Sequence, residues 1–419
     1  MALPHQGAWP GFRPRPVPEL LIAAARVVPG TGEPGILEPG YVLVSGGRVA
    51  EVTAGPPPRA PDLDLNRGYL VPGLIDLQVN GYFGVDLAEP DAAGWRRVVR
   101  RLPETGTTGF LPTLITAPLA ELGAVLRFAA GFAANPPAGA RILGVHQEGP
   151  FLAPSRAGAH RRDWIVPPSP EAVAGLLAAG VGMLRVVTLA PEVEGGLAAV
   201  AALASAGVLV SIGHSDATAR QVAAAVDAGA RMVTHLFNAQ RPLHHREPGV
   251  VGQALADPRL TCGLIADPSH VSAAGCAIAF AAAPGRIFLV TDASAAAGMP
   301  PGQYRIGGEP VEVRPGDDPA PRRADGTLAG SVLRMDQAVA NMEAAGAGLP
   351  EAVAAATRIP ADLIGRPDLG RLVPGAAADL AWLGDDLRTR ATWVAGQQVY
   401  PAGAMPTAGP VPTAGPGPA

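Results

Sequence analysis

Residues 208–235 read VLVSIGHSDATARQVAAAVDAGARMVTH and contain an apolar run, an alanine-rich stretch and a second apolar run. Short apolar runs such as Val208–His214 and Met232–His235 are typical of buried strands, and the stretch between them is typical of a helix. Two buried strands joined by a helix form one unit of a parallel sheet. The stretch therefore predicts an α/β fold in which such units repeat.

The same alternation of apolar runs and alanine-rich stretches continues on both sides of this unit, from Val71 onward. Eight strands with helical connections predict a (β/α)8 barrel of the TIM type. Helical stretches are also expected after a Gly/Pro-rich insertion that follows the last strand. The candidate strands are Leu74–Asn80, Thr108–Thr113, Ile142–Glu148, Leu184–Leu189, Val208–His214, Met232–His235, Cys262–Asp267 and Ile287–Asp292.

The segments that flank the barrel predict a second, smaller domain. Short β-type runs such as Tyr41–Ser45 precede the barrel, and a β-type return at Leu380–Val399 follows it. We expect residues 19–70 and 370–400 to form a small β-sandwich domain around the barrel of residues 71–369. The Pro- and Gly-rich ends, residues 1–18 and 401–419, are expected to be disordered.

Charge and composition exclude several classes of function. The chain has 32 basic and 36 acidic residues, a net charge of -4, and all its basic residues are arginine because it contains no lysine. Nucleic-acid binding is not expected because the chain has no excess of positive charge. Schiff-base and P-loop mechanisms are excluded because each of them needs a lysine. The two cysteines form no CxxC pattern, and the N-terminal residues lack the apolar core of a secretory signal. We therefore expect a cytoplasmic protein without membrane or nucleic-acid partners.

Polar residues at the ends of the candidate strands predict a metal site. Glu148, His214 and His235 each end a strand, and the carboxyl ends of barrel strands meet on the face where active sites form. One carboxylate and two imidazoles suit zinc or a similar divalent ion and leave a position open for water. Each residue alone is more often an ordinary hydrogen-bonded side chain, but the three together favour a metal site.

Asp292 closes the last candidate strand and has two interpretations. It is either the cap of the following helix or, beside a metal site, the general base for a water molecule. We favour the base. Gly213–Ala217 also approximates the nucleophile elbow of an α/β-hydrolase, with Ser215 as nucleophile, but the order of acid and histidine in the chain argues against it. Ser215 is better explained as a helix N-cap.

Six segments, in order along residues 20–400, resemble the N-acetylglucosamine-6-phosphate deacetylases of the amidohydrolase superfamily. This resemblance implies hydrolysis of the acetamide of N-acetylglucosamine 6-phosphate to glucosamine 6-phosphate and acetate, in amino-sugar catabolism or cell-wall recycling. Two alternatives stay open: the galactosamine isomer as substrate, and a non-catalytic sugar-phosphate-binding protein. The segments are Val71–Asp76 (VPGLID), His146–Phe151 (HQEGPF), Gly213–Ser215 (GHS), Thr234–Ala239 (THLFNA), Arg246–Gly249 (REPG) and Thr291–Ala293 (TDA).

The resemblance also implies roles for individual residues in the catalytic step. Glu148, His214 and His235 would hold one divalent ion per subunit, with Zn²⁺ expected and Fe²⁺, Co²⁺ or Mn²⁺ as alternatives. Asp292 would act as base and then as acid, and His160 would help to polarise the acetyl carbonyl.

Further residues are expected to contact the substrate. The resemblance implies that the phosphate meets Asn238, the backbone of Ala239, His270 and Arg246, and that Arg246 reaches across a homodimer interface. Many amidohydrolases have an H-x-H motif at the end of the first strand, where this chain has Gln78 and Asn80. Because amides are weak metal ligands, we expect these two residues to contact substrate, and we expect no second ion.

Overall fold

The computed structural model describes residues 18–32, 35–316 and 318–401. Nearly all of the two terminal segments expected to be disordered therefore lies outside the described residues. Within the described ranges, no helix combines the length and the apolar character needed to cross a membrane.

Eight parallel strands form a barrel, confirming the predicted fold class. Neighbouring strands pair in the order in which they occur in the chain. A parallel bridge between Val79 and Ala293 brings the last strand back to the first, so that the sheet is nearly closed. The barrel strands are β6 (Leu74–Val79), β9 (Thr107–Leu114), β11 (Val145–Glu148), β12 (Leu184–Leu189), β13 (Leu209–Ile212), β14 (Met232–Val233), β15 (Thr261–Leu264) and β16 (Ile287–Leu289).

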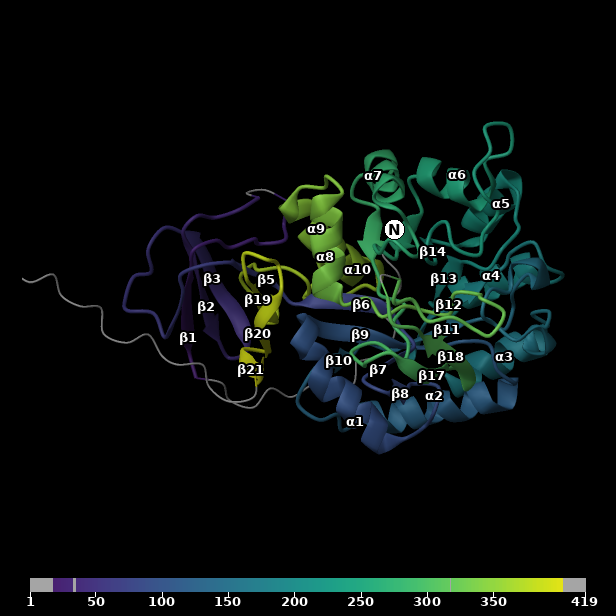
Figure 1. The fold of residues 1–419 in the computed structure, drawn as a ribbon, viewed down its shortest axis with the longest axis horizontal. Helices are drawn as coiled ribbons and strands as arrows, with labels where there is room; N and C mark the ends of the chain where they lie inside the picture. The colour runs from purple at the N-terminus through teal and green to yellow at the C-terminus, as the bar shows by residue number, and fades with distance from the viewer. Residues whose placement is uncertain (1–17, 33–34, 317, 402–419) are drawn as a thin grey trace, which may run out of the picture.

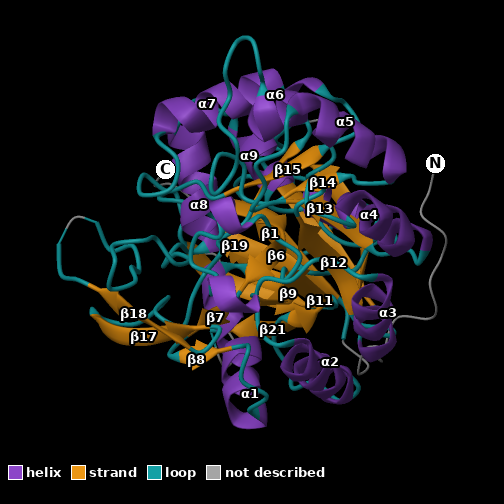
Figure 2. Cartoon of the chain, turned by 90° about the vertical axis from the view of Figure 1, so that its right-hand side faces the viewer, coloured by secondary structure: helices purple, strands orange, loops and turns teal. Residues whose placement is uncertain are grey.

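One helix follows each barrel strand and covers the outside of the sheet, as Figure 2 shows. Leucine, valine and alanine side chains from both layers pack into one continuous core. The helices are α1 (Ala92–Arg101), α2 (Leu119–Ala133), α3 (Pro170–Ala179), α4 (Gly196–Ser205), α5 (Ala219–Ala228), α6 (Gly249–Ala256), α7 (Ala273–Ala282) and α8 (Met335–Ala344), with α9 (Leu349–Ala355) and α10 (Arg358–Leu363) after them.

The observed strands differ from the predicted ones mainly at their ends. The expected strand Ile142–Glu148 is interrupted at Gly144, where φ is 117°, and a two-residue strand β10 (Arg141–Ile142) precedes β11. Several strands also end before the polar residues expected to close them. His214, for example, lies two residues beyond the end of β13.

Two four-stranded sheets lie beside the barrel, on the left of Figure 1. One combines β1 to β4, and the other pairs β5 with the C-terminal β19, β20 and β21. Side chains from both sheets, such as Ile22 and Trp393, share a small apolar core. The strands are β1 (Leu20–Ala24), β2 (Gly40–Ser45), β3 (Arg48–Ala54), β4 (Leu63–Leu65), β5 (Tyr69–Pro72), β19 (Leu380–Leu383), β20 (Thr389–Val394) and β21 (Gln397–Tyr400).

Two β-hairpins lie in the connections that follow the first and the last barrel strand. A short one, β7 (Gly81–Tyr82) with β8 (Val85–Asp86), follows the first barrel strand. A longer one, β17 (Gly302–Ile306) with β18 (Glu309–Val313), lies within the Gly/Pro-rich insertion, for which no secondary structure was expected. Figure 2 shows this hairpin projecting beside the barrel mouth.

Candidate active site

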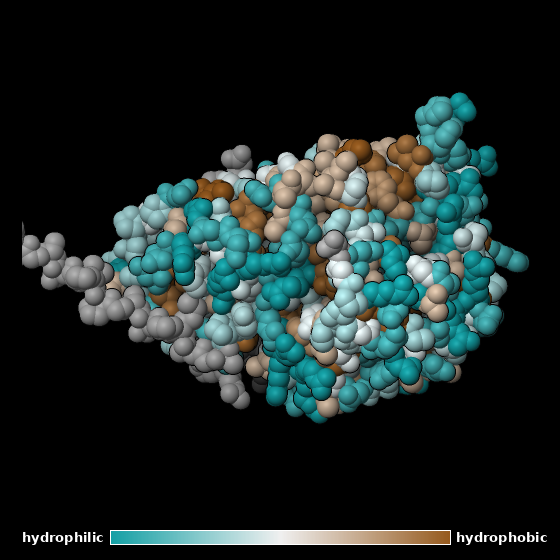
Figure 3. Space-filling view, viewed as in Figure 1, coloured by the Kyte–Doolittle hydropathy of each residue, from teal (hydrophilic) through white to brown (hydrophobic). Residues whose placement is uncertain are grey.

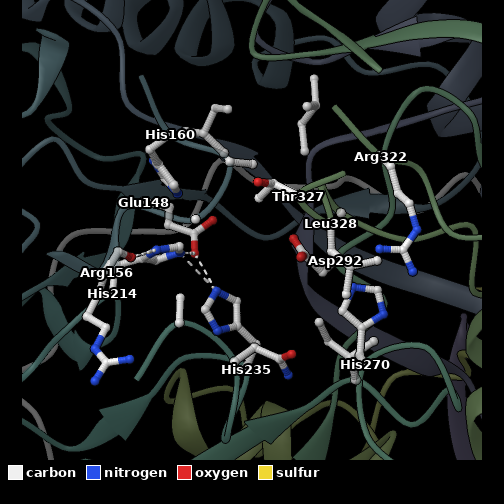
Figure 4. A pocket seen from close by; sticks show the side chains of 18 of the residues that line it. Glu148, Arg156, His160, His214, His235, His270, Asp292, Arg322, Thr327 and Leu328 are labelled. Carbon is white, nitrogen blue, oxygen red and sulfur yellow. Dashed lines mark hydrogen bonds and ion pairs between the residues drawn. The ribbon is translucent and has the colours of Figure 1, made fainter. Parts of the chain in front are cut away.

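The three predicted metal ligands converge at the carboxyl ends of β11, β13 and β14. Oε1 of Glu148 lies 3.1 Å from Nε2 of His214 and 3.0 Å from Nε2 of His235. The two imidazole nitrogens lie 3.1 Å from each other. All three side chains are almost fully buried, and Figure 4 shows them turned toward one another. The structure therefore brings together the cluster expected from the sequence.

An unusual backbone conformation directs three polar side chains of the site into the barrel. His214, His235 and Asp292 all have positive φ values, of 47°, 27° and 51°. Non-glycine residues seldom adopt this left-handed conformation, which costs on the order of 1–3 kcal/mol and tends to occur at functional sites. It turns the chain two or three residues after the strand ends, at the residue that carries the polar group.

The three donor atoms fit a single metal ion. Their separations of 3.0–3.1 Å are slightly shorter than the roughly 3.3–3.6 Å between tetrahedral ligands with bonds of roughly 2.0–2.2 Å, so small side-chain movements would accommodate an ion. Burial alone would raise the pKa of Glu148, but hydrogen bonds and charge interactions with His214 and His235 outweigh it and hold this pKa well below its usual range. Nδ1 of His214 lies 2.9 Å from the carbonyl oxygen of Arg156, as expected of a histidine oriented for ligation through Nε2.

Asp292 faces this cluster across the pocket (Figure 4). The amide groups of Asn80 and Gln78 donate to its Oδ1 over 2.6 and 3.1 Å. Within the described part of the chain, its other oxygen, Oδ2, has no hydrogen-bond partner. Burial raises the pKa of Asp292 to about 6, and the negative charge of Glu148 adds to this effect. A carboxyl group tuned toward neutral pH, with one free oxygen, is suited to general acid and base catalysis.

Gln78 and Asn80 were expected to contact substrate, but they are not among the pocket-lining residues. Both side chains are buried behind Asp292, and Gln78 also donates to Oε2 of Glu148 over 3.2 Å. Their carbonyl oxygens, Oε1 and Oδ1, are buried without a protein partner. Their observed contacts orient the two carboxylates, and a contact with substrate stays a prediction.

His160 lies beside the cluster with its ring 4.3 Å from that of His214. The backbone N–H of Thr116 donates to Nδ1 of His160 over 3.2 Å, so that the proton of a neutral ring resides on Nε2. Burial lowers the pKa of His160 well below its usual range, and the charge of His214 lowers it further. The ring is therefore neutral and carries an N–H donor at a pocket-lining position.

The cluster and Asp292 line a cavity of about 500 Å³. Asn238, Ala239 and His270, all predicted to contact the phosphate, also line this cavity. Nδ1 of His270 donates to the carboxylate of Asp267 at 2.9–3.0 Å, which leaves its Nε2 for a ligand. The cavity therefore joins a hydrolytic centre to a region with polar donors.

The predicted phosphate ligand Arg246 is absent from the lining of this cavity. It lies on the exposed loop before α6, and its guanidinium contacts His245 over 2.8 Å. Sequence reasoning missed other lining residues, among them Arg156, Arg322 and Ile306. No motif marks them, because they come from a short turn after β11 and from the insertion after β16.

Fold and site together define a hydrolase built on a (β/α)8 barrel, with carboxylate and imidazole donors at the carboxyl ends of its strands. The model of the amidohydrolase family matches residues 69–399. The chain belongs to the amidohydrolase family, whose members are metal-dependent hydrolases. The resemblance to N-acetylglucosamine-6-phosphate deacetylases is also confirmed by comparison with individual proteins.

Two curated relatives and one solved structure illustrate this likeness. The chain is 40% identical to an N-acetylgalactosamine-6-phosphate deacetylase of Escherichia coli O157:H7, over 78% of this chain and 87% of the relative. It is 39% identical to an N-acetylglucosamine-6-phosphate deacetylase of Danio rerio, over 81% and 86%. A variant N-acetyl-D-glucosamine-6-phosphate deacetylase from Mycobacterium smegmatis, in complex with N-acetyl-D-glucosamine-6-phosphate, superposes with a TM-score of 0.85 at 36% identity, over 91% of this chain and 99% of that one.

Proposed function

We propose that the protein hydrolyses the acetamide of N-acetyl-D-glucosamine 6-phosphate to D-glucosamine 6-phosphate and acetate. The observation that carries this proposal is the cluster of Glu148, His214 and His235 facing Asp292 in one cavity. The names of the relatives support the choice of substrate. A role in amino-sugar catabolism or cell-wall recycling follows from the same chemistry.

Glu148, His214 and His235 hold one divalent ion per subunit in this proposal, with Zn²⁺ as the first choice. Such an ion lowers the pKa of a water molecule and polarises the acetyl carbonyl. The side-chain amides of Gln78 and Asn80 bind carboxylates, and these two positions therefore supply no imidazole ligand for a second ion.

Protons are moved by the side chains that surround this cluster. Oδ2 of Asp292 takes a proton from the attacking water and returns it to the departing amine nitrogen. Asn80 and Gln78 keep the carboxylate aligned through Oδ1 while Oδ2 reacts. Nε2–H of His160 donates to the carbonyl oxygen, where negative charge develops.

The substrate phosphate binds at the other side of the cavity. Asn238 and the backbone N–H of Ala239 supply donors from one subunit, and the protonated ring of His270 adds Nε2–H, since its Nδ1 already donates to Asp267. Arg246 supplies the cation from the partner copy of a homodimer, because it does not line its own cavity and arginine suits phosphate.

An apolar surface supports this homodimer. Figure 3 shows a brown patch over α6 and α7, beside the projecting loop that joins β14 to α6. Ile278 on α7 and Leu243 on that loop are 61% and 56% exposed. Helix α7 carries no charged residue, and burying such a face against a second copy would remove apolar surface from water.

One alternative substrate is favoured by a specific observation. A relative with 40% identity is named for the galactosamine isomer, and the two substrates differ at a single carbon. A non-catalytic binding protein is disfavoured by the complete set of polar groups in the cavity.

A cytoplasmic setting is also part of the proposal, since Cys262 and Cys276 are both free thiols.

A panel of substrates tests the proposal. The purified protein would be assayed for acetate release from the 6-phosphates of N-acetylglucosamine and N-acetylgalactosamine and from both unphosphorylated sugars, with metal content measured in parallel. We expect turnover of the glucosamine phosphate and one ion per chain. Absence of acetate release from a metal-loaded protein would refute the activity, and two essential ions per chain would refute the single-ion site.

A further inference from the structure

A further buried carboxylate, Asp76, lies behind the active site in strand β6. It is 1% exposed and belongs to the VPGLID segment, to which the proposed chemistry assigns no role. Its Oδ2 accepts a hydrogen bond of 2.5 Å from the hydroxyl of Thr291. Its Oδ1 accepts from the backbone N–H groups of Thr291 and Gln78 over 3.3 and 3.1 Å. Asp76 therefore joins the first barrel strand to the residue that immediately precedes Asp292.

The backbone around Asp292 is held from two sides. On the barrel side, the N–H of Asp292 donates to the carbonyl of Gln78 over 2.9 Å. On the other side, Ser331 donates from its N–H to the carbonyl of Asp292 over 2.8 Å and from its hydroxyl to the carbonyl of Thr291 over 2.5 Å. These contacts surround a residue at φ 51°, a left-handed conformation that is uncommon for residues other than glycine.

The side chain of Asp76 reaches both Gln78 and Thr291 from the first strand. Asp76 accepts from the N–H of Gln78 and so holds the residue whose side chain donates to Oδ1 of Asp292. Asp76 also contacts Thr291 and so holds the backbone next to Asp292. We propose that Asp76 is a positioning residue that, through Thr291 and Gln78, sets the orientation in which the Asp292 carboxylate meets the attacking water.

This inference rests on the proposed function, in which Asp292 moves the proton. Loss of positioning should lower kcat and leave KM and metal content unchanged, because Asp76 touches neither the cavity nor the three metal-binding side chains. Removal of a group that orients an active-site side chain typically costs about 10–100-fold in activity.

The experiment compares isosteric variants at both ends of the contact. Thr291→Val removes the hydroxyl that donates to Asp76, and Asp76→Asn replaces one of the two acceptor oxygens by an N–H donor, whereas Thr291→Ser retains the hydroxyl. We expect a fall of about 10–100-fold in kcat for the first two variants, unchanged KM and metal content, and recovery in Thr291→Ser. The double variant should lose less than the two single variants would by simple addition, because both remove the contact between the Thr291 hydroxyl and Asp76.

A matched control exists elsewhere in the fold. Asp336 at the start of α8 is also buried and accepts from the N–H and hydroxyl of Thr389 on β20 over 3.0 and 2.9 Å. Asp336→Asn and Thr389→Val should lower the melting temperature without changing kcat. This pair also joins a buried carboxylate to a threonine hydroxyl, although Asp336 additionally pairs with Arg334 and Arg388, and it lies outside the cavity lining.

The outcomes separate this inference from the function on which it rests. An inactive but metal-loaded wild-type protein would refute the proposed function and this inference with it. An active wild type whose Asp76→Asn and Thr291→Val variants keep full kcat would overturn the positioning role alone. Failure of both variants to fold would also overturn it, since the contact would then serve stability.

Discussion

Asp292 receives two amide hydrogen bonds on the same oxygen, which allows a sharp test of its role. In Asp292→Asn, the retained carbonyl oxygen can accept from Asn80 and Gln78 as Oδ1 does now, so the fold and the metal content should be preserved. The chemical step should fall by roughly 10²–10⁴-fold, the range of general acid–base catalysis.

Measurement of kcat, metal content and melting temperature on the same Asp292→Asn preparation checks this prediction. The alternative role, a helix cap, would cost at most about 0.5–2 kcal/mol of stability on truncation and leave kcat almost unchanged. A folded, metal-loaded Asn variant with wild-type kcat would therefore contradict the proposed mechanism.

Arg246 gives a second prediction at the scale of the residue. If it binds phosphate from the partner subunit, Arg246→Ala should raise KM strongly for the phosphorylated substrate and hardly affect an unphosphorylated one. Steady-state kinetics on both substrates provide the measurement. Arg220→Ala, on the neighbouring helix α5, serves as a control for the loss of one positive charge. Equal losses on both substrates would show that Arg246 has a structural role.

At the scale of the element, the hairpin of β17 and β18 forms part of the cavity wall. Ile306 packs with Ile115 and Val311 in a small apolar cluster, and both isoleucines line the cavity. The hairpin turn lies directly on Ile115, because a Cβ at Gly307 would meet its Cγ1 at 2.3 Å. The N–H of Gly308 donates to the buried Asp86 over 2.8 Å and ties the turn to β8.

This arrangement predicts different effects of two adjacent substitutions. Gly307→Ala should push Ile115 or the hairpin out of place, costing about 1–3 kcal/mol of stability and raising KM. Gly308 also has a positive φ, 80° compared with 56° at Gly307, but nothing lies within 4 Å of a Cβ added at Gly308. It should therefore show only the backbone cost of about 1–2 kcal/mol, with KM unchanged.

Denaturant unfolding and steady-state kinetics of the two glycine variants, compared side by side, check this prediction. The same KM in Gly307→Ala and in the wild type would show that the hairpin does not shape the cavity.

At the scale of the whole molecule, the barrel is joined to the C-terminal strands by a buried ion pair. Nε and Nη2 of Arg141 on β10 donate to the two carboxylate oxygens of Asp379, each over 2.9 Å. Asp379 is 4% exposed and also accepts from the N–H of Ala395 over 2.7 Å. Removing one partner of such a pair leaves an uncompensated buried charge.

Arg141→Ala should therefore lower the free energy of unfolding by roughly 3–5 kcal/mol. Arg390→Ala, which breaks an exposed pair with Asp386, should cost about 0–1 kcal/mol. Turnover of the folded fraction should be unchanged in both variants. Denaturant titration is the measurement, and equal losses in the two variants would contradict a structural connection through Arg141.

Local patterns in the sequence were sufficient to predict the barrel and the centre of its site. Apolar runs and alanine-rich stretches identify strands and helices, and the carboxyl ends of parallel strands must meet on one face. Residues that follow those ends, Glu148, His214, His235 and Asp292, are therefore neighbours in any barrel of this topology.

Only the tertiary structure decided the surroundings of that centre. The β17–β18 hairpin, the cavity positions of Arg322 and Ile306, and the contact between Asp76 and Thr291 have no periodic signal in the sequence. The same holds for Gln78 and Asn80, which bind carboxylates at the back of the cavity. Each of these features depends on residues far apart in the chain, and their packing, unlike hydrophobic periodicity, exists only after the barrel has closed.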